Sequence, residues 1–197
     1  KLHYYNEFRH PHQHSILYLQ RLRRYQDIIE KDKDLCLGSY CFLWGQKQES
    51  TSTWHGMYLS NGHPTEAVDV MQYCWKGEWP AKRAPSLMQI KLNGENWKKN
   101  HVFIKNQEVI LDFIYERNNN DSLYFDFQLY PETFSTKGGG DFQKSPDKLK
   151  FEIVEQSENS LSFKVPNKKG FYRIFVFVRN ETNQTSVANI PFKVEQL

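Results

Sequence analysis

The chain has 197 residues, of which 39% are hydrophobic and 25% charged, and its aromatic residues comprise 14 Phe, 11 Tyr and 5 Trp. This composition is typical of a globular protein whose core draws heavily on aromatic side chains, and the length allows one large domain or two small ones. The formal net charge of +3 is small and the basic residues are scattered. Both features exclude a nucleic-acid-binding face built from clustered Lys and Arg.

Neither the cysteines nor the histidines form a metal-binding pattern. The three cysteines are odd in number and contain no Cys-x-x-Cys pair, so we interpret them as buried free thiols. Four histidines precede residue 15, and the alternative there is a metal site. Pro11 prevents a helical pair of histidines, and no carboxylate or cysteine follows at ligand spacing. We therefore predict no metal ion and no cofactor.

Two features of the sequence bear on membranes and export. No apolar run approaches the ~18–20 residues of a transmembrane helix, so we predict no membrane span. The opening residues, KLHYYNEFRHPHQH, lack the apolar centre of a secretory signal.

The first 80 residues alternate between helical and extended patterns. Apolar residues recur near the 3.6-residue period from Ile16 to Ile29, which predicts a helix with Ser15 as its N-cap. Residues 35–44 are an almost uninterrupted apolar run, which predicts a strand buried on both faces, as in a parallel sheet or barrel. A polar loop follows, and then a second helix over residues 65–75 with Thr65 as its cap.

Beyond a Pro-flanked connector the pattern predicts strands alone. Seven are expected, at residues 87–92, 108–115, 123–130, 149–155, 160–165, 172–179 and 186–194. Their number and spacing favour an immunoglobulin-like β-sandwich. In residues 171–179 the alternation assigns Tyr172, Ile174, Val176 and Val178 to the core, whereas Arg173 and its neighbours on the opposite face are expected to point to water.

One stretch of the first half resembles a known family. Residues 37–49, LGSYCFLWGQKQE, continuing through residues 53–56, TWHG, to residues 65–69, TEAVD, resemble the eighth strand, loop and helix of bacterial glycoside hydrolase family two-like TIM-barrel proteins. In such barrels the last strand commonly ends in a Trp that lines the sugar subsite next to the cleaved bond. The resemblance places Trp44 at that position, and it implies five sugar-facing residues: Trp44, Gln46, Lys47, Gln48 and Trp54.

The second half is similar to the polycystic-kidney-type and fibronectin-like sandwiches that often follow such barrels. Gly170 and Tyr172 stand where those domains carry a Gly-x-Tyr entry to a late strand, in the manner of a tyrosine corner. The expected fold class is therefore α+β and multidomain. Residues 1–80 would be a fragment of a (β/α)8 barrel comprising its last strand and helices, residues 81–85 a linker, and residues 86–197 an all-β immunoglobulin-like sandwich.

The catalytic chemistry of that family is expected to lie elsewhere. Glycoside hydrolysis needs two facing carboxylates, ~5–5.5 Å apart for retention and ~6.5–9.5 Å apart for inversion. The family supplies them from its fourth and seventh strands, which the resemblance places before this chain. Asn6-Glu7 looks like an acid/base pair, but the segment before it is too short and polar for a buried strand, and we interpret Glu49 as a rim carboxylate. We predict no catalytic residue here, and no glycosidase activity of this chain alone.

Two functional hypotheses remain. In the first, the chain is the C-terminal portion of a glycoside hydrolase that acts on a polysaccharide or oligosaccharide, is periplasmic or secreted, and has the carbohydrate and the remaining N-terminal part of the barrel as partners. In the alternative, it is a non-catalytic carbohydrate-binding or structural accessory module whose sandwich presents aromatic residues such as Trp97, Tyr124 or Phe134.

Overall fold

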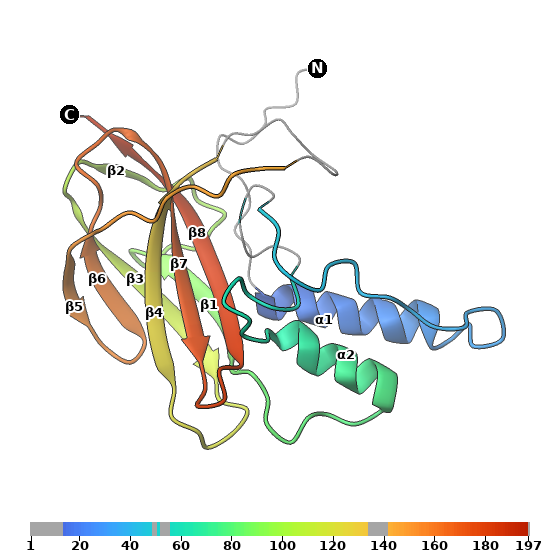
Figure 1. Cartoon of the computed structure of the whole chain (residues 1–197). Helices are drawn as coiled ribbons and strands as arrows, with labels where there is room; N and C mark the ends of the chain where they lie inside the picture. Colours follow the sequence, from blue (N-terminus) through green and yellow to red (C-terminus); the bar gives the residue numbers. More distant parts are fainter. Residues whose placement is uncertain (1–13, 49–50, 52–55, 134–141, 197) are drawn as a thin grey trace.

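The computed structural model describes residues 14–48, 51, 56–133 and 142–196, and there two helices lie against one side of a β-sandwich (Figure 1). Helix α1 spans His14–Arg24 and continues as a π-helical turn, η1, over Tyr25–Ile29. Helix α2 spans Glu66–Lys76. Helix α2 confirms the prediction for residues 65–75, including its cap, because Thr65 Oγ1 accepts a hydrogen bond from Ala67 N at 3.3 Å.

The sandwich consists of two four-stranded sheets. The first has the order β1-β3-β6-β5 and contains antiparallel pairs of β1 (Ser86–Leu92), β3 (Glu108–Glu116), β6 (Ser160–Lys164) and β5 (Ile153–Gln156). The second has the order β2-β8-β7-β4 and contains β2 (Val102–Ile104), β8 (Thr185–Glu195), β7 (Gly170–Arg179) and β4 (Tyr124–Pro131). Strand β2 runs parallel to β8, whereas the other two pairs are antiparallel. The predicted β-sandwich is therefore confirmed.

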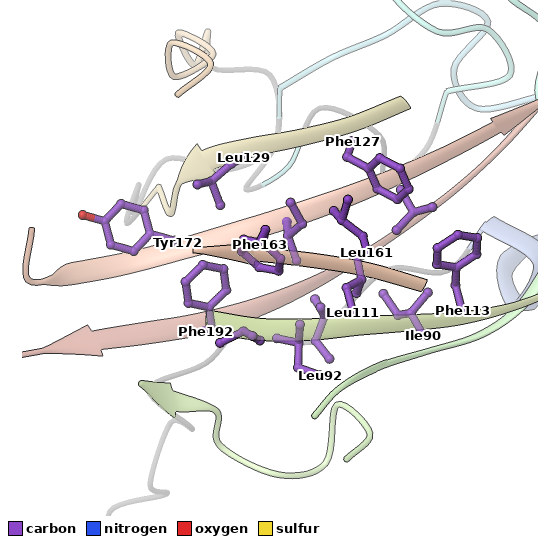
Figure 2. Close-up of a cluster of buried hydrophobic side chains, with 14 of the residues drawn as sticks. Ile90, Leu92, Leu111, Phe113, Phe127, Leu129, Leu161, Phe163, Tyr172 and Phe192 are labelled. Atoms are coloured by element: carbon purple, nitrogen blue, oxygen red, sulfur yellow. The ribbon is translucent and has the colours of Figure 1, made fainter. Parts of the chain in front are cut away.

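The space between the sheets is filled by aliphatic and aromatic side chains (Figure 2). Phe192 is fully buried and packs against the rings of Phe163 and Tyr172, with centroids 6.2 and 5.8 Å away. The alternation predicted for β7 holds on this side, since Ile174, Val176 and Val178 lie in the core. The Tyr172 hydroxyl donates to Lys168 O at 2.8 Å, which is the backbone contact expected of a tyrosine corner.

The helical half is attached to the outer face of the second sheet. Leu59 packs on Phe175 and Val187, which point away from the sandwich core. At the start of α2 the Glu66 carboxylate accepts a hydrogen bond from Ser186 Oγ at 2.6 Å. Asp69, one turn later, accepts one from Ala84 N at 2.7 Å. These contacts bury polar groups between helix and sheet, so the two halves share an interface.

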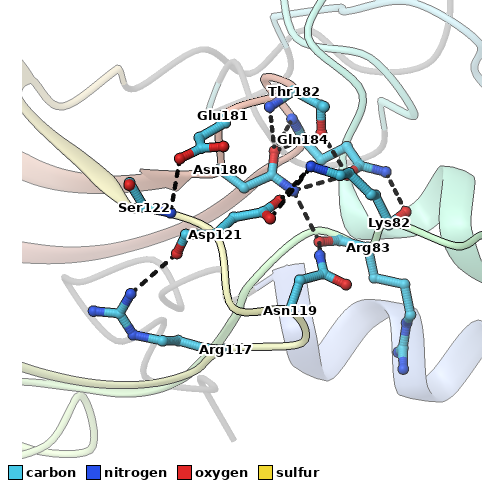
Figure 3. A network of polar contacts seen from close by, with 10 residues as sticks. All are labelled: Lys82, Arg83, Arg117, Asn119, Asp121, Ser122, Asn180, Glu181, Thr182 and Gln184. Carbon is cyan, nitrogen blue, oxygen red and sulfur yellow. Dashed lines mark hydrogen bonds and ion pairs between the residues drawn. The ribbon is translucent and has the colours of Figure 1, made fainter.

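The segment predicted to be a linker is held by the sandwich (Figure 3). Arg83 O accepts hydrogen bonds from Asn119 Nδ2 at 2.9 Å and Asn180 Nδ2 at 3.0 Å. Lys82 pairs with Asp121 at 3.2 Å. The division into domains at residues 81–85 stays a prediction, but in this structure those residues are fixed to the loops at one end of the sandwich.

Residues 35–44 do not form the predicted buried strand, and that expectation is wrong. Leu35, Leu37, Tyr40 and Phe42 are 82%, 103%, 101% and 81% exposed. A strand buried on both faces needs a hydrogen-bonded strand on each side and a layer above and below it. In the described part of the chain, no strand pairs with this segment, and there is no barrel.

Three smaller expectations also differ from the structure. Ser15 is not an N-cap, because the helix has already begun at His14. The three cysteines are free, as expected, but they are only partly buried. Arg173 does not reach water, since its side chain is 3% exposed and pairs with Glu132. Arg173 lies on the outer face of β7, as predicted, but it is covered there and its charge is balanced by a carboxylate from a distant position of the chain.

Candidate functional site

The structure places four of the five predicted sugar-facing residues, and it divides them between two sites. Trp44 is 61% exposed, and its ring lies 5.1 Å from the ring of Tyr58 at an interplanar angle of 40°. Gln46, Lys47 and Gln48 instead line a pocket of about 290 Å³ on the outer face of the second sheet, and Trp44 does not line it. Trp54 lies outside the described residues.

The backbone around residue 56 turns the glutamines toward the sandwich. Met57 N and Tyr58 N donate to Leu43 O and Trp44 O at 3.2 and 3.1 Å, so these two segments run side by side. This close approach explains why residue 56 is a glycine. A Cβ at that position would overlap Gln46 Nε2 and lie 2.6 Å from Gly45 O. A residue without a side chain is therefore required where the Gln46 amide crosses the turn.

The floor of the pocket is a buried ion pair. Arg173 on β7 donates to Glu132 through Nε at 2.8 Å and through Nη2 at 3.0 Å, and the two side chains are 3% and 4% exposed. The remaining nitrogen of the guanidinium, Nη1, donates to Asn189 Oδ1 on β8. A bidentate pair of this kind leaves no net charge at the floor and occupies the fork that would otherwise hold an anion.

One wall of the pocket is aromatic. The rings of Tyr130 on β4 and Phe175 on β7 meet edge to face, with centroids 5.5 Å apart. The Tyr130 hydroxyl donates to Gln128 Oε1 at 2.7 Å, and burial raises the pKa of that hydroxyl above its usual value of 10.0. Tyr130 therefore stays a neutral donor at physiological pH.

Two buried side-chain atoms of the pocket-lining glutamines have no hydrogen-bond partner among the described residues. They are Gln46 Nε2, a donor, and Gln48 Oε1, an acceptor. Gln48 is only 8% exposed. Native proteins pair nearly all such buried groups with protein atoms, water or a ligand, because an unpaired one costs roughly 1–3 kcal/mol.

A second hollow of about 170 Å³ adjoins the pocket beside His63, Asp126 and Arg179, and Gln46, Ser60 and Tyr130 line both. His63 lies at its edge, and burial together with the charge of Arg179 lowers the pKa of its ring below 6.5. The outer face of β4 and β7 thus carries a polar groove that begins beside Gln48.

Sequence reasoning missed the residues that β4 and β7 contribute. A signal was present, because Arg173, Phe175 and Phe177 share one face of β7, and two aromatic residues on the face opposite the core indicate that it is covered. What covers it could not be inferred, since Gln46–Gln48 and Arg173 are separated by more than a hundred positions of sequence.

Metal and catalytic candidates can be placed only in part. Glu7, Glu49 and three of the N-terminal histidines lie outside the described residues. Within residues 14–48, 51, 56–133 and 142–196, no three His, Cys, Asp or Glu side chains lie close enough to hold a metal ion. None of the helices described there is long and apolar enough to cross a membrane.

No family model matches the chain, and no curated protein matches it. Among solved structures it is similar to a nucleoside hydrolase-related protein of Saccharophagus degradans described as associated with carbohydrate metabolism, at 16% identity over 66% of this chain and 29% of that chain, with a TM-score of 0.39. It is also similar to the copper resistance protein PcoC of Escherichia coli, at 14% identity over 56% and 99% of the two chains and a TM-score of 0.31. Murine CRIg matches at 8% identity over 57% and 98%, with a TM-score of 0.32.

The chain spans less than a third of the length of the first of these structures. With TM-scores below 0.5, the three similarities carry no argument about function. A proposal about function therefore has to rest on the geometry of the chain itself.

Proposed function

We propose that the chain is the C-terminal portion of a carbohydrate-active protein, a glycoside hydrolase acting on a polysaccharide or oligosaccharide, and that it contributes a sugar-binding surface at Trp44. The observation that carries the proposal is the exposure of Trp44 beside Tyr58. A flat, accessible indole can lie against the apolar C–H face of a pyranose. The resemblance of residues 37–69 to the end of a glycosidase barrel motivates the same assignment at the level of sequence, although residues 35–44 form no strand in the structure.

The order of the strands supports the finer description of the second half as an immunoglobulin-like domain. One sheet has the order β1-β3-β6-β5 and the other contains β8-β7-β4, which corresponds to the arrangement of that fold with an added edge strand, β2. Such a domain would follow the barrel of the intact protein.

The exposed side chains of residues 35–44 are consistent with a partner that covers them. Large apolar side chains that protrude together from one segment mark an interaction surface. In the proposed protein the remaining N-terminal part of the barrel lies there and supplies the pair of catalytic carboxylates. The same proposal places the protein in the periplasm or outside the cell.

The test is to titrate the 197-residue chain with a panel of xylo-, cello-, manno- and galacto-tetrasaccharides and follow tryptophan fluorescence. We expect Trp44→Ala to weaken binding by about tenfold, which is 1.4 kcal/mol, with little change in melting temperature. The matched control is Trp97→Ala, which removes an exposed tryptophan from the loop between β1 and β2. Equal affinity of the Trp44 variant and the unaltered chain would contradict the proposal.

The second candidate is a non-catalytic carbohydrate-binding or structural accessory module. A complete two-sheet core inside this chain favours it, because such a core does not depend on a neighbouring barrel. Aryl glycosides distinguish the candidates: the chain alone is expected to be inactive in both, whereas a longer protein containing it hydrolyses them only in the first. Turnover by this chain that disappears in Glu7→Gln would contradict both.

A further inference from the structure

A separate groove lies in the helical half, between residues 21–29 and residues 39–42, with Met71 of α2 at its base. After η1 the chain turns at Asp32, whose carbonyl oxygen accepts a hydrogen bond from Cys36 N at 2.7 Å, and it returns along α1 (Figure 1). The volume of this helix groove is about 450 Å³. That volume lies within the roughly 300–1,000 Å³ typical of small-molecule sites.

The walls of the helix groove are mostly apolar. Met71 is only 7% exposed, whereas Tyr40 and Phe42 on the returning segment are 101% and 81% exposed. Trp75 Nε1 on α2 donates to Ser39 Oγ at 3.4 Å, which holds this segment beside the helices. A ligand with an apolar body would cover part of both exposed rings, and removing that surface from water is favourable.

The charged residues of the lining are both cations, Arg21 and Arg24. They are three residues apart on α1, so they share a face of the helix. Desolvation raises the pKa of the Tyr25 hydroxyl and of the Cys41 thiol above their usual values, so both groups stay neutral at physiological pH. The lining therefore carries positive charge and no anion of its own.

The carboxylates that follow these arginines along the helix have other partners. Asp27 pairs with Lys31 at 3.0 Å, and Glu30 pairs with Lys33 at 3.7 Å. Among the residues that the structure describes, no Asp or Glu lines the helix groove. Charge complementarity therefore favours a ligand that brings a negative charge.

We propose that the helix groove binds a small amphipathic anion, an acyl chain that ends in a carboxylate. The carboxylate pairs with Arg24 beside Arg21, and the chain lies against Phe42 and Met71. A guanidinium matches the planar carboxylate in shape and charge.

The inference does not rest on the sugar-binding proposal, because Trp44 does not line the helix groove. Leu35 and Leu37 also lie outside it, so they remain available to a partner that covers the segment.

The test is an NMR titration of the 197-residue chain, labelled at its three methionine methyl groups, with sodium octanoate. We expect a saturable shift of the Met71 signal with a dissociation constant on the order of 1 mM, as for a ligand of this size. Met88 on β1 is the internal control and should not shift. Sodium acetate lacks the chain and should give no saturable shift, and octyltrimethylammonium, with the opposite charge, should bind at least about fivefold more weakly.

Two neighbouring arginines test the charge. Arg24→Gln should weaken octanoate binding by about threefold to fivefold, the upper end of what an exposed ion pair contributes. Arg23→Gln is the matched control, because Arg23 is also exposed in the last turn of α1 but does not line the groove. The control should bind octanoate as the unaltered chain does.

Two exposed residues of the returning segment test the apolar contact. Phe42→Ala should weaken octanoate binding by about fivefold, because it removes apolar surface that the chain would cover. Leu37→Ala, at a position that is 103% exposed and outside the groove, should leave binding unchanged. Both side chains are exposed, so neither variant should unfold the chain.

The absence of a saturable Met71 shift with octanoate overturns the proposal. Equal affinity for octanoate and octyltrimethylammonium, or equal binding by Arg24→Gln and Arg23→Gln, overturns the anion site. Equal shifts of Met71 and Met88 would mean that octanoate coats apolar surface without a specific site, which also overturns it. A chain that binds no tetrasaccharide but shows the Met71 shift supports the helix groove and contradicts the sugar-binding proposal alone.

Discussion

The sandwich and the helical half of this chain are both rich in apolar residues, yet they use them differently. The sandwich buries twenty apolar side chains in one cluster between its sheets. The helical half buries Met57, Ala67 and Met71 in a small cluster and leaves Leu37 and Phe42 exposed. An apolar run therefore predicts which side chains of a segment can be buried, but not that they are buried. Burial also needs a second apolar surface, and each sheet of the sandwich finds that surface in the other sheet.

The largest effect should come from the core of the sandwich. Phe192 is fully buried among aromatic rings, so Phe192→Ala should lower the free energy of unfolding by about 4–5 kcal/mol through lost burial and a cavity. Met57→Ala, at the centre of the small cluster, should cost about 2 kcal/mol. Urea unfolding measures both. A Met57 variant that loses as much stability as the Phe192 variant would show that the two cores do not differ as described.

The ion pair beneath the pocket should come next. Arg173→Met leaves the Glu132 carboxylate buried without its partner and should cost about 3–4 kcal/mol. The double variant Arg173→Met with Glu132→Leu removes both charges and should recover most of that loss. Urea unfolding of the three proteins forms the cycle. No recovery in the double variant would mean that packing, not the uncompensated charge, explains the loss.

The contact between the two halves should depend on pH. Burial raises the pKa of the Asp69 carboxyl from 3.8 to about 6, although the hydrogen bond from Ala84 N and the charge of Arg83 oppose the shift. Because the folded protein holds the proton more tightly, Asp69 contributes its full stability below about pH 4, and this is lost as the pH rises through 6. Between pH 4 and 7 the chain should lose about 2–3 kcal/mol relative to Asp69→Asn. Parallel stability curves for the two proteins would show that the pKa is not raised.

The smallest effect should come from the exposed segment. Leu37 has 103% of its reference surface accessible, so Leu37→Ser should change the free energy of unfolding by less than about 0.5 kcal/mol. Thermal unfolding at low protein concentration measures this, and Leu161→Ser, at a fully buried position of β6, is the contrasting variant. A loss above about 2 kcal/mol in Leu37→Ser would show that this segment is covered in solution.

Much of the sandwich could be predicted because its signals are local. Strand alternation gave the core face of β7, and Asn93-Gly94 marked the end of β1, where both residues adopt positive φ angles of 49° and 77°. Strand β2 was missed because it has three residues, Val102–Ile104, and it pairs with β8, some ninety positions away. A strand that short is defined by pairing, not by composition.

The candidate site was predictable only on one side. The family resemblance implied a sugar-facing segment at Gln46–Gln48, but nothing local connects that segment to Glu132 or Arg173. The same gap explains the wrong expectation for Arg173, since an arginine on a strand faces water unless a distant carboxylate is brought to it. The sequence did not show that Trp44 and the glutamines lie in different places. That separation depends on the turn at Gly56, where the backbone lies close to Gly45 and the Gln46 amide.

The parallel pairing of β2 with β8 has a mechanical consequence. The three residue pairs of this seam run in the same direction, with Val102 opposite Lys193 and Ile104 opposite Glu195. Tension applied between the start of β2 and the end of β8 therefore slides the strands past each other. Their hydrogen bonds are strained together, not one after another as in peeling, so a short seam resists a pulling force far better than its length suggests.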